Sequence, residues 1–575
     1  MKKIALISVS NKNGLLELAN ELLLNDYTII STGGTYKKLQ EISNQNIINV
    51  EEFTGFPEIL NGRVKTLNPK ILGGILARRD IDSHLEDLEQ IKSSYIDLVV
   101  VNLYPFKEVI SNENHKFEDA IENIDIGGVT LIRAACKNYK DVRIITDPED
   151  YNICCSNTDK DNINLYLAKK GWVHIADYDI SISQYFNQDK RYRSYNNEIT
   201  LKYGCNPNQG DAHLMSMNGK NPITILNGKP GFINLLDAFS SWQLVKEIST
   251  CGYPAAASFK HTAPAGVAIG KDAIDENTMK SWNLTDTIKS KTAIAFIRAR
   301  QADPLSSFGD FIAISSKVDK ETANLIKREV SDGIIAPDYD EDALEILKNK
   351  KNGNYLVIQV DNTFELGDST EYREVFGMTL TQQRHNIIVT TDDMKNWVTD
   401  KSADDSDILL DLFIANCTLK YTPSNSIVYA YKGQVIGVGA GQQNRVDCVQ
   451  LAGNKAVNWW KRQSPCIIDA NFPQNTKRQD KVNYIMDFIN SEQKENTIFY
   501  KTDKDDLHMK NLHNQDIVMA SDAFFPFPDS IDKCNSKGVK YIIQPGGSIA
   551  DENVIQRCNE YGIGMCFSGV RMFYH

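Results

Sequence analysis

Residues 4–35 read IALISVSNKNGLLELANELLLNDYTIISTGGT and indicate the fold class of the N-terminal part of the chain. The apolar, β-branched runs 4–9 and 27–30 are typical of buried strands, and residues 14–24 between them have the length and apolar spacing of a helix. Strands that alternate with helices predict a parallel sheet covered by helices. Further strands are expected at 98–103 and 142–146, and a further helix at 35–42.

Polar turns follow the predicted strands. In parallel sheets, ligands bind at the carboxyl ends of the strands. The segments expected at that edge are Ser8–Lys12, Ser31–Thr35, Asn102–Pro105 and Thr146–Pro148.

The length of 575 residues predicts at least two domains, because one hydrophobic core does not grow to this size. A segment rich in Tyr, Asn and Asp runs from about residue 159 to 197, and we place the domain boundary near residue 195. The expected domains are residues 1–195 and 197–575. The second mixes helical and strand patterns over a length that suits two α/β subdomains.

The net charge of -12 opposes binding to nucleic acid or to a membrane surface. The eleven cysteines are scattered without a C-x-x-C pair, which is typical of a reduced compartment. The N-terminus does not resemble a signal peptide, and no apolar run reaches 18 residues. We therefore expect a cytosolic protein.

The N-terminal region carries four motifs whose residue types suit a phosphorylated ligand. Ser31–Thr35 could cradle a phosphate with its backbone N–H groups, although a plain strand-to-helix turn explains that segment alone equally well. The three other motifs add two cations, a strand-end tyrosine and an aspartate before paired glycines. They are Gly62–Leu67 (GRVKTL), Asn102–Phe106 (NLYPF) and Ile124–Thr130 (IDIGGVT), the last opening a helix that carries Arg133 and Lys137.

The C-terminal region contains AAASFKHTAPAG at residues 255–266, in which an apolar strand delivers Lys260 and His261 into a turn. A cation beside an imidazole favours its neutral form, which a general base requires, and can stabilise developing negative charge. A lone histidine more often packs or is solvated. Other polar turns are LKYGCNP (201–207), RQADPLSSFG (300–309), SDGIIAP (331–337), YTPSNS (421–426), GVGAGQQNR (437–445) and SDAFFPFPD (521–529).

In this order and spacing, the motifs resemble the bifunctional purine-biosynthesis family that joins AICAR formyltransferase (AICAR transformylase) to IMP cyclohydrolase. The resemblance implies a methylglyoxal-synthase-like fold for residues 1–195 and two cytidine-deaminase-like subdomains for residues 197–575. It implies formyl transfer from 10-formyltetrahydrofolate to AICAR, giving FAICAR, and cyclisation of FAICAR to IMP with loss of water. It also implies a homodimer with transformylase sites at the subunit interface, and no metal for the chemistry.

The resemblance assigns cyclisation to Lys65, Tyr104, Asp125 and Lys137. The implied IMP and FAICAR site consists of Ser10, Asn11, Lys12, Thr32, Gly33, Gly34, Thr35, Arg63, Val64, Lys65, Thr66, Val101, Asn102, Asp125 and Ile126.

For formyl transfer, the resemblance implies His261 as general base, assisted by Lys260 and Asn425. The implied AICAR site consists of Lys202, Tyr203, His261, Gly309, Asp332, Asn425, Arg445, Phe524 and Arg571. The implied folate contacts are Val446, Asp529, Ser548 and Ile549.

Four positions depart from the family pattern. Asn68 and Leu72 replace two histidines after the catalytic lysine, so these positions cannot carry protons here. Lys202 replaces an arginine, and Ala263 replaces an asparagine. Lysine cannot form the two-pronged contact of arginine with phosphate, so we expect weaker AICAR binding.

Three other functions are open to the sequence. The first domain could be a nucleotide-sensing regulatory module, although Lys65, Tyr104, Asp125 and Lys137 together favour chemistry. The second could be a zinc deaminase, but such enzymes need H-x-E with P-C-x-x-C, and Cys466 after Pro465 has no second cysteine at that spacing. A non-enzymatic scaffold leaves the clustered polar turns unexplained.

Overall fold

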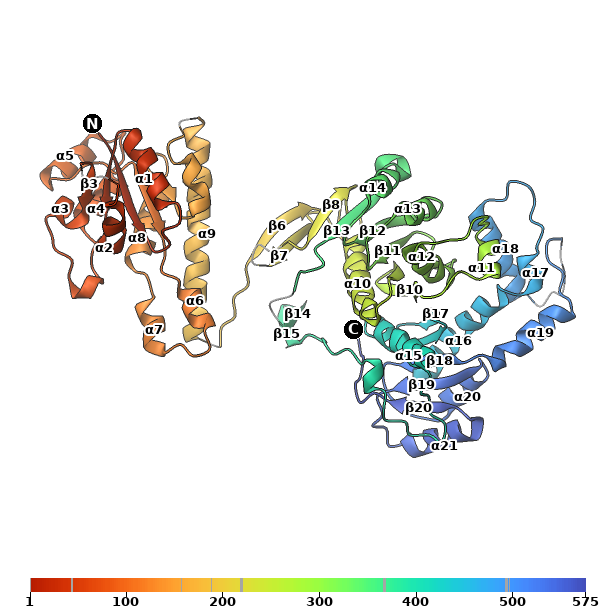
Figure 1. Cartoon of the computed structure of the whole chain (residues 1–575). Coiled ribbons are helices and arrows are strands. Elements are labelled where there is room, and N and C mark those ends of the chain that lie inside the picture. Colours follow the sequence, from red (N-terminus) through yellow and green to blue (C-terminus); the bar gives the residue numbers. More distant parts are fainter. Residues whose placement is uncertain are drawn as a thin grey trace. The chain divides into compact units, whose positions relative to one another are not determined.

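The computed structural model describes residues 2–42, 45–156, 158–187, 189–217, 221–365, 369–491, 495 and 497–575. The chain divides into two compact units, Met1–Ser194 and Tyr195–His575 (Figure 1). Among the described residues, no helix combines the length and apolar character needed to cross a membrane.

The first unit is built on a parallel five-stranded sheet in the order β3-β2-β1-β4-β5. The predicted strands form β1 (Lys3–Val9), β2 (Tyr27–Ser31), β4 (Leu98–Asn102) and β5 (Arg143–Ile145), and the short edge strand β3 (Ile47–Asn49) was not predicted. The helices are α1 (Leu15–Leu24), α2 (Gly33–Leu39), α3 (Val50–Thr54), α4 (Pro69–Leu76), α5 (Asp82–Gln90), α6 (Phe106–Ser111), α7 (Phe117–Glu122), α8 (Gly127–Lys137) and α9 (Lys160–Phe186).

Helix α9 differs most from the sequence expectation, because its 27 residues fill most of the segment that carries little apolar pattern. It packs against α8 and β5 through Leu167, Ala168, Gly171 and Ile175, which are buried. Its other faces mix charged and polar residues with exposed side chains such as Trp172 and Val173. Tertiary packing along one narrow stripe therefore stabilises α9, although the spacing of its apolar residues does not predict an amphipathic helix.

The second unit contains an eleven-stranded sheet in the order β20-β19-β18-β16-β17-β10-β9-β11-β12-β13-β8. Its strands are β8 (Ile223–Asn227), β9 (Ala255–Lys260), β10 (Ala263–Ile269), β11 (Asp310–Ile314), β12 (Ser331–Ala336), β13 (Leu356–Val360), β16 (Ile427–Tyr431), β17 (Gln434–Gly439), β18 (Ile517–Ser521), β19 (Val539–Gln544) and β20 (Gly564–Phe567). Two hairpins lie outside it, formed by β6 (Tyr195–Thr200) with β7 (His213–Met217) and β14 (Thr370–Val375) with β15 (Met378–Gln383).

The helices of this unit form layers on both faces of the large sheet. They are α10 (Phe232–Ile248), α11 (Glu276–Ser281), α12 (Lys291–Gln301), α13 (Lys320–Lys327), α14 (Glu341–Lys348), α15 (Ser406–Leu419), α16 (Arg445–Lys461), α17 (Pro465–Ile468), α18 (Arg478–Asn490), α19 (Asp503–Asn511), α20 (Asp529–Asn535) and α21 (Asp551–Tyr561). Alternation along β9 separates the layers: Ala255, Ala257 and Phe259 join the core beneath α10 and α15, whereas Ala256 joins the core beneath α12 and α13. The α/β fold class predicted from the sequence is confirmed.

The unit consists of two similar halves. Each begins with a helix (α10 or α15), continues into an antiparallel hairpin (β9–β10 or β16–β17), and adds three parallel strands (β11–β13 or β18–β20) with intervening helices. The halves join where β10 runs antiparallel to β17, with Ala268 opposite Gln434. The two hairpin turns, at 261–262 and 432–433, therefore lie at opposite edges of one continuous sheet.

We predict that Gly171→Ala destabilises the first unit, although alanine is the better helix former by about 0.5–1 kcal/mol. A Cβ at Gly171 would lie 2.6 Å from Cys136 Sγ, so α9 must move away from α8. We expect a net loss of about 1–3 kcal/mol, measured by urea unfolding followed in that unit.

The additional substitution Cys136→Ala removes the clash and should recover part of the loss. Gly34→Ala, in α2 of the same unit, is the matched control, because its added methyl group meets no atom within 4 Å. A rise in unfolding midpoint for Gly171→Ala alone would contradict the packing explanation.

Candidate functional sites

A cavity of about 700 Å³ lies at the carboxyl edge of the parallel sheet in the first unit. The ends of β1, β2 and β4 deliver polar groups to it, as expected for this type of sheet. The predicted residues that line it are Ser10, Lys12, Thr32, Gly34, Thr35, Arg63, Lys65, Thr66, Asn102, Tyr104, Asp125 and Ile126. Asn11, Gly33, Val64 and Val101 are chain neighbours of these residues but do not line the cavity, and Val101 is buried in the sheet.

Asn102, at the end of β4, holds the loop after β1 in place. Its side-chain oxygen accepts hydrogen bonds from the backbone N–H groups of Ser10 (2.5 Å) and Asn11 (2.8 Å), and its amide nitrogen donates to Asn11 O (3.0 Å). Thr35 bonds both backbone groups of Val9. The loops that follow β1 and β2, which are the candidates for binding a phosphate, are therefore hydrogen-bonded to each other without a ligand.

Lys65 reaches over the start of α2. Gly33 has a left-handed backbone (φ 43°), and a Cβ there would lie 3.2 Å from Lys65 Nζ, so glycine leaves room for the ammonium group. The ammonium lies 3.3 Å from Glu58 Oε1, a residue that the sequence reasoning did not single out. One cation can thus face the cavity while keeping a carboxylate partner.

Hydrogen bonds hold Asp125 in the lining of the cavity. Its Oδ1 accepts from Gly128 N at 2.6 Å, and its own N–H donates to the hydroxyl of Tyr178 at 2.7 Å. Burial raises the pKa of the Asp125 carboxyl above its usual value, although hydrogen bonds from the backbone of Gly128 and Tyr104 act in the opposite direction. Gly128 is required, because a Cβ there would lie 2.6 Å from Asp125 Oδ2.

The structure does not bring Lys137 to the other predicted catalytic groups within one chain. Lys137 is the exposed last residue of α8, whose first residues Gly127 and Gly128 line the cavity, and about 15 Å of helix separate the two ends. Conversely, the lining includes residues that the sequence reasoning missed. Asn61, Ile121, Glu122 and Asn123 come from short irregular or helical segments without a motif.

In the second unit, the predicted residues gather at one edge of the large sheet. Lys260 ends β9 and His261 follows it, Asp332 is the second residue of β12, and Asn425 precedes β16. The strand pairings place these positions at the same edge as Arg445, Phe524, Ser548 and Arg571, which follow β17, β18, β19 and β20. Residues spread over more than 300 positions of sequence thus share one edge.

The turn that carries His261 is strained and tied down. His261 (φ 54°) and Thr262 (φ 61°) both have left-handed backbones, which cost about 1–3 kcal/mol each in residues other than glycine. Asp237, buried on α10, accepts a hydrogen bond from Thr262 N at 2.7 Å. Burial raises the pKa of Asp237 to about 6, and the His261 side chain acts in the opposite direction.

Lys260 points toward the loop before β11. Its ammonium donates to Phe308 O at 2.5 Å, beside Gly309, whose φ is 77°. Lys260 is therefore held at the edge through its own side chain, whereas His261 is held through the backbone of the turn. The sequence did not single out Asp237, because one aspartate among the apolar residues of a helix has no motif around it.

Asn425 and Arg445 form a second cluster at this edge. Arg445 Nη2 donates to Asn425 Oδ1 at 2.7 Å, and Arg445 also pairs with the buried Asp522. Asn425 Nδ2 donates to Gln442 O at 2.8 Å. The C-terminal residues pack here, since Met572 N donates to Asp522 O and Tyr574 N donates to the Ser424 hydroxyl.

The remaining predicted contacts are placed on the surface around these clusters. Phe524 and Ile549 expose large side chains, and Arg571 lies over the Phe573 ring at 4.6 Å. Ser548 N donates a hydrogen bond to Asp551 Oδ2, whereas Asp529 begins α20 and Val446 lies in the first turn of α16. Lys202 and Tyr203 are exposed in the segment after β6.

One group of potential metal ligands occurs among the described residues, formed by Glu21, Cys154 and Cys155. The two sulfur atoms lie 3.5 Å apart. Burial raises the pKa of the Cys154 thiol well above its usual value, which disfavours the thiolate that a metal requires. Neither predicted site includes these residues.

Comparison with known proteins agrees with this geometry. A family model described as AICARFT/IMPCHase bienzyme matches residues 135–455, and one described as MGS-like domain matches residues 14–130. The chain is 38% identical over 591 residues to the bifunctional purine biosynthesis protein PurH of Clostridium botulinum strain Hall, and 37% identical to that of strain Kyoto, with 100% of both chains covered. The chain belongs to the AICARFT/IMPCHase bienzyme family. It is accordingly an AICAR formyltransferase and IMP cyclohydrolase of purine biosynthesis.

Among solved structures, one described as ForH is similar to part of this bienzyme. It is 30% identical and covers 32% of this chain and 100% of its own, with a TM-score of 0.29. The MGS-like match confirms the fold predicted for the first unit.

We predict that Asp237→Ala lowers kcat for formyl transfer by about 10²-fold, because the turn that aims His261 loses its anchor and shifts by a fraction of an ångström to 1 Å. Asp237→Asn keeps an oxygen acceptor for Thr262 N and should retain most of the activity. Steady-state kinetics of formyl transfer provide the measurement.

The second half of the sheet supplies a matched control. Asp411 accepts from Lys432 and Gly433 under the equivalent turn, at the opposite edge. Asp411→Ala should cost stability yet spare formyl transfer. Equal losses of kcat in both alanine variants would show that Asp237 acts through stability alone.

Proposed function

We propose that the two activities occupy separate sites, with cyclisation in the cavity of the first unit and formyl transfer at the edge that carries Lys260 and His261. The observation that supports this division is that each unit carries its own convergent set of cations, carboxylates and amides. The N-terminal cavity, at about 700 Å³, is large enough for a nucleotide.

In the cyclisation, the carboxamide nitrogen of FAICAR attacks the formyl carbon, and the formyl oxygen leaves as water. We propose that Lys65 polarises the formyl oxygen and that Asp125 accepts the proton from the attacking nitrogen, with Tyr104 beside them. Asp125 suits this task because its raised pKa makes it a better base than an exposed carboxylate. Lys137 remains a predicted participant that one chain alone does not place there.

Positioning should contribute more than proton transfer to this step. The reacting groups belong to one molecule, so holding them in contact can lower the barrier by up to about 7–11 kcal/mol. General acid–base help adds about 10²- to 10⁴-fold, which is roughly 3–5 kcal/mol. The rigid network around Asn102 and Thr35 is therefore as important as the reactive side chains.

For formyl transfer, we propose that His261 removes a proton from the AICAR amine while Lys260 and Asn425 stabilise the oxygen of the tetrahedral intermediate. The family's activity implies a folate-type one-carbon donor. We propose 10-formyltetrahydrofolate, held near Val446, Asp529, Ser548 and Ile549, and no metal in the chemistry. AICAR would lie between the two clusters of the edge, with contacts from Lys202, Tyr203, Asp332, Arg445, Phe524 and Arg571.

We also propose that the protein works as a cytosolic homodimer whose transformylase sites lie at the subunit interface. The exposed side chains of Tyr203, Phe524 and Ile549 support the interface, because a partner surface would cover apolar groups that a single chain leaves in water. The cysteines, all free among the described residues, suit a reducing compartment.

The assignment predicts that the two activities separate by mutation. Incubation of the protein with AICAR and 10-formyltetrahydrofolate should yield IMP. Lys65→Ala should accumulate FAICAR, with cyclisation reduced by about 10²-fold or more, whereas His261→Ala should lose formyl transfer and still convert added FAICAR. Loss of both activities in either folded variant would contradict two independent sites.

The departure at Lys202 predicts a gain of affinity. Lys202→Arg supplies a planar group that can bind a phosphate through two parallel hydrogen bonds, so KM for AICAR should fall by about threefold to tenfold while cyclisation of FAICAR is unchanged. The exposed Lys229→Arg serves as the control. An unchanged KM would place Lys202 away from the AICAR phosphate.

A further inference from the structure

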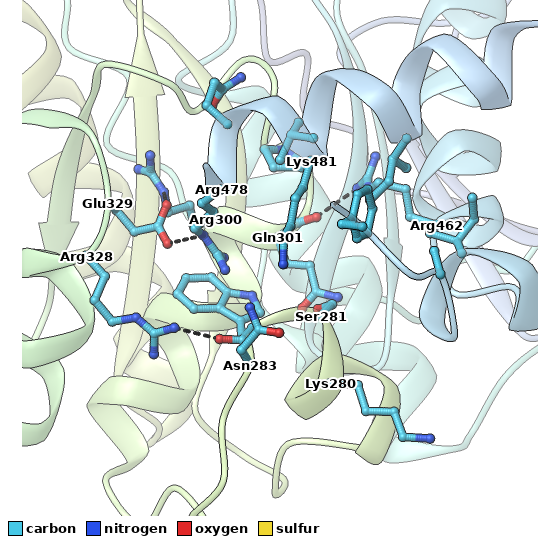
Figure 2. A pocket seen from close by; sticks show the side chains of 18 of the residues that line it. Lys280, Ser281, Asn283, Arg300, Gln301, Arg328, Glu329, Arg462, Arg478 and Lys481 are labelled. Atoms are coloured by element: carbon cyan, nitrogen blue, oxygen red, sulfur yellow. Dashed lines mark hydrogen bonds and ion pairs between the residues drawn. The ribbon is translucent and has the colours of Figure 1, made fainter. Parts of the chain in front are cut away.

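A second cavity, of about 200 Å³, lies in the C-terminal unit beside the formyl-transfer edge. Its walls come from α11, the end of α12, the loop before β11, residues 328–330, and α16 to α18 (Figure 2). None of the predicted substrate or folate contacts lines it.

The lining is strongly cationic, in a chain whose net charge is -12. Glu329 is its only carboxylate among the described residues. The positively charged side chains are Lys280, Arg300, Arg328, Arg462, Arg478 and Lys481.

Three of these cations have carboxylate partners. Arg300 pairs with Asp310 and Glu329, Arg478 pairs with Glu329, and Lys280 pairs with Glu276. Arg478 also lies over the Trp282 ring at 4.2 Å. These contacts account for part of the positive charge and make one wall rigid.

The other three cations lack such partners in the described part of the chain. Arg462 donates through Nη2 to the carbonyl oxygens of Gln301 (2.8 Å) and Ala302 (2.7 Å), and Arg328 donates to Trp282 O at 2.8 Å. Lys481 faces the Phe472 ring at 5.1 Å. Neutral carbonyls and a ring orient these groups but do not neutralise them.

Of these three cations, Arg462 and Lys481 are partly removed from water, whereas Arg328 is exposed. Burying a cation without a carboxylate partner is costly. Burial lowers the pKa of Arg462 to about 10, which reflects that cost. An anion in the cavity would offset it by forming charge-assisted hydrogen bonds with guanidinium groups that are already oriented. A single small anion would leave several of the charges unmatched.

The cavity shares a wall with the formyl-transfer edge. Phe308 lines the cavity, and its carbonyl oxygen accepts the hydrogen bond from Lys260 Nζ. Arg300 in the wall pairs with Asp310, which in turn accepts from the Ser258 hydroxyl, two residues before Lys260 on β9. A ligand in the cavity would therefore contact the segments that hold Lys260.

We propose that this cavity binds a ligand carrying two or more adjacent anionic groups, carboxylates or phosphates, next to the formyl-transfer site. Two sources share this chemistry. One is a chain of γ-linked glutamates on the folate donor, an identification that rests on the proposed function, and the other is a free polyphosphate.

The test is calorimetric titration of the full-length protein at low salt with two probes, tri-γ-glutamate and inorganic pyrophosphate. We expect saturable binding of at least one probe, weakened about tenfold by Arg462→Gln and by Lys481→Gln. Lys481→Gln is the safer variant, because Arg462 also holds two backbone carbonyls. Lys320→Gln, an exposed lysine on α13, is the matched control and should bind as the wild type does.

Displacement separates the two sources. Loss of tri-γ-glutamate binding when the protein is saturated with a polyglutamylated folate donor would identify the glutamate chain, whereas pyrophosphate binding that the donor leaves intact would identify a free polyphosphate. Absence of saturable binding for both probes, or equal binding by the variants and the wild type, overturns the proposal. A failure of the proposed function would instead appear as formyl transfer that His261→Ala leaves intact.

Discussion

The hydrogen bond from Thr262 N to the buried Asp237 carboxylate is the contact on which the formyl-transfer edge depends. It holds two residues with unfavourable backbones in a turn that glycine or asparagine would form more easily. The turn sets the direction of His261. Lys260 is the neighbouring residue at the end of β9, and the loop before β11 accepts a hydrogen bond from its ammonium group. A carboxylate inside a helix thus fixes the turn that carries His261, the base that we propose for formyl transfer.

The chain is acidic overall, yet its substrates and products are anions. The protein binds anions by placing cations at the sites themselves, where backbone N–H groups also donate hydrogen bonds. In the first unit, Lys65 has Glu58 nearby, and in the second, Arg445 has Asp522. Each paired carboxylate keeps a cation in place at a modest cost in charge, so the positive groups are ordered before a ligand arrives.

Much of the first unit could be predicted from sequence, because short β-branched runs and the polar turns after them are local signals. Helix α9 could not, since its buried stripe is narrow and side chains such as Trp172 and Val173 also lie on its exposed faces. Lys137 ends a helix whose first turn lines the cavity. The sequence motif shows both ends of this helix but not that its length places Lys137 away from the cavity. Asp237 and the cations of the second cavity come from segments far apart in the chain, so only the folded structure reveals their proximity.

The antiparallel junction between β10 and β17 suggests how the second unit evolved. Two equal halves that share one sheet through matching hairpins are what the duplication and fusion of a self-associating ancestor would leave behind. Such an ancestor would have had two identical edges. In the present chain only one edge keeps the reactive turn, while Lys432 and Gly433 close the other over Asp411. The second half no longer has a reactive turn of its own, but it supplies Asn425, Arg445 and Phe524 to the edge that does.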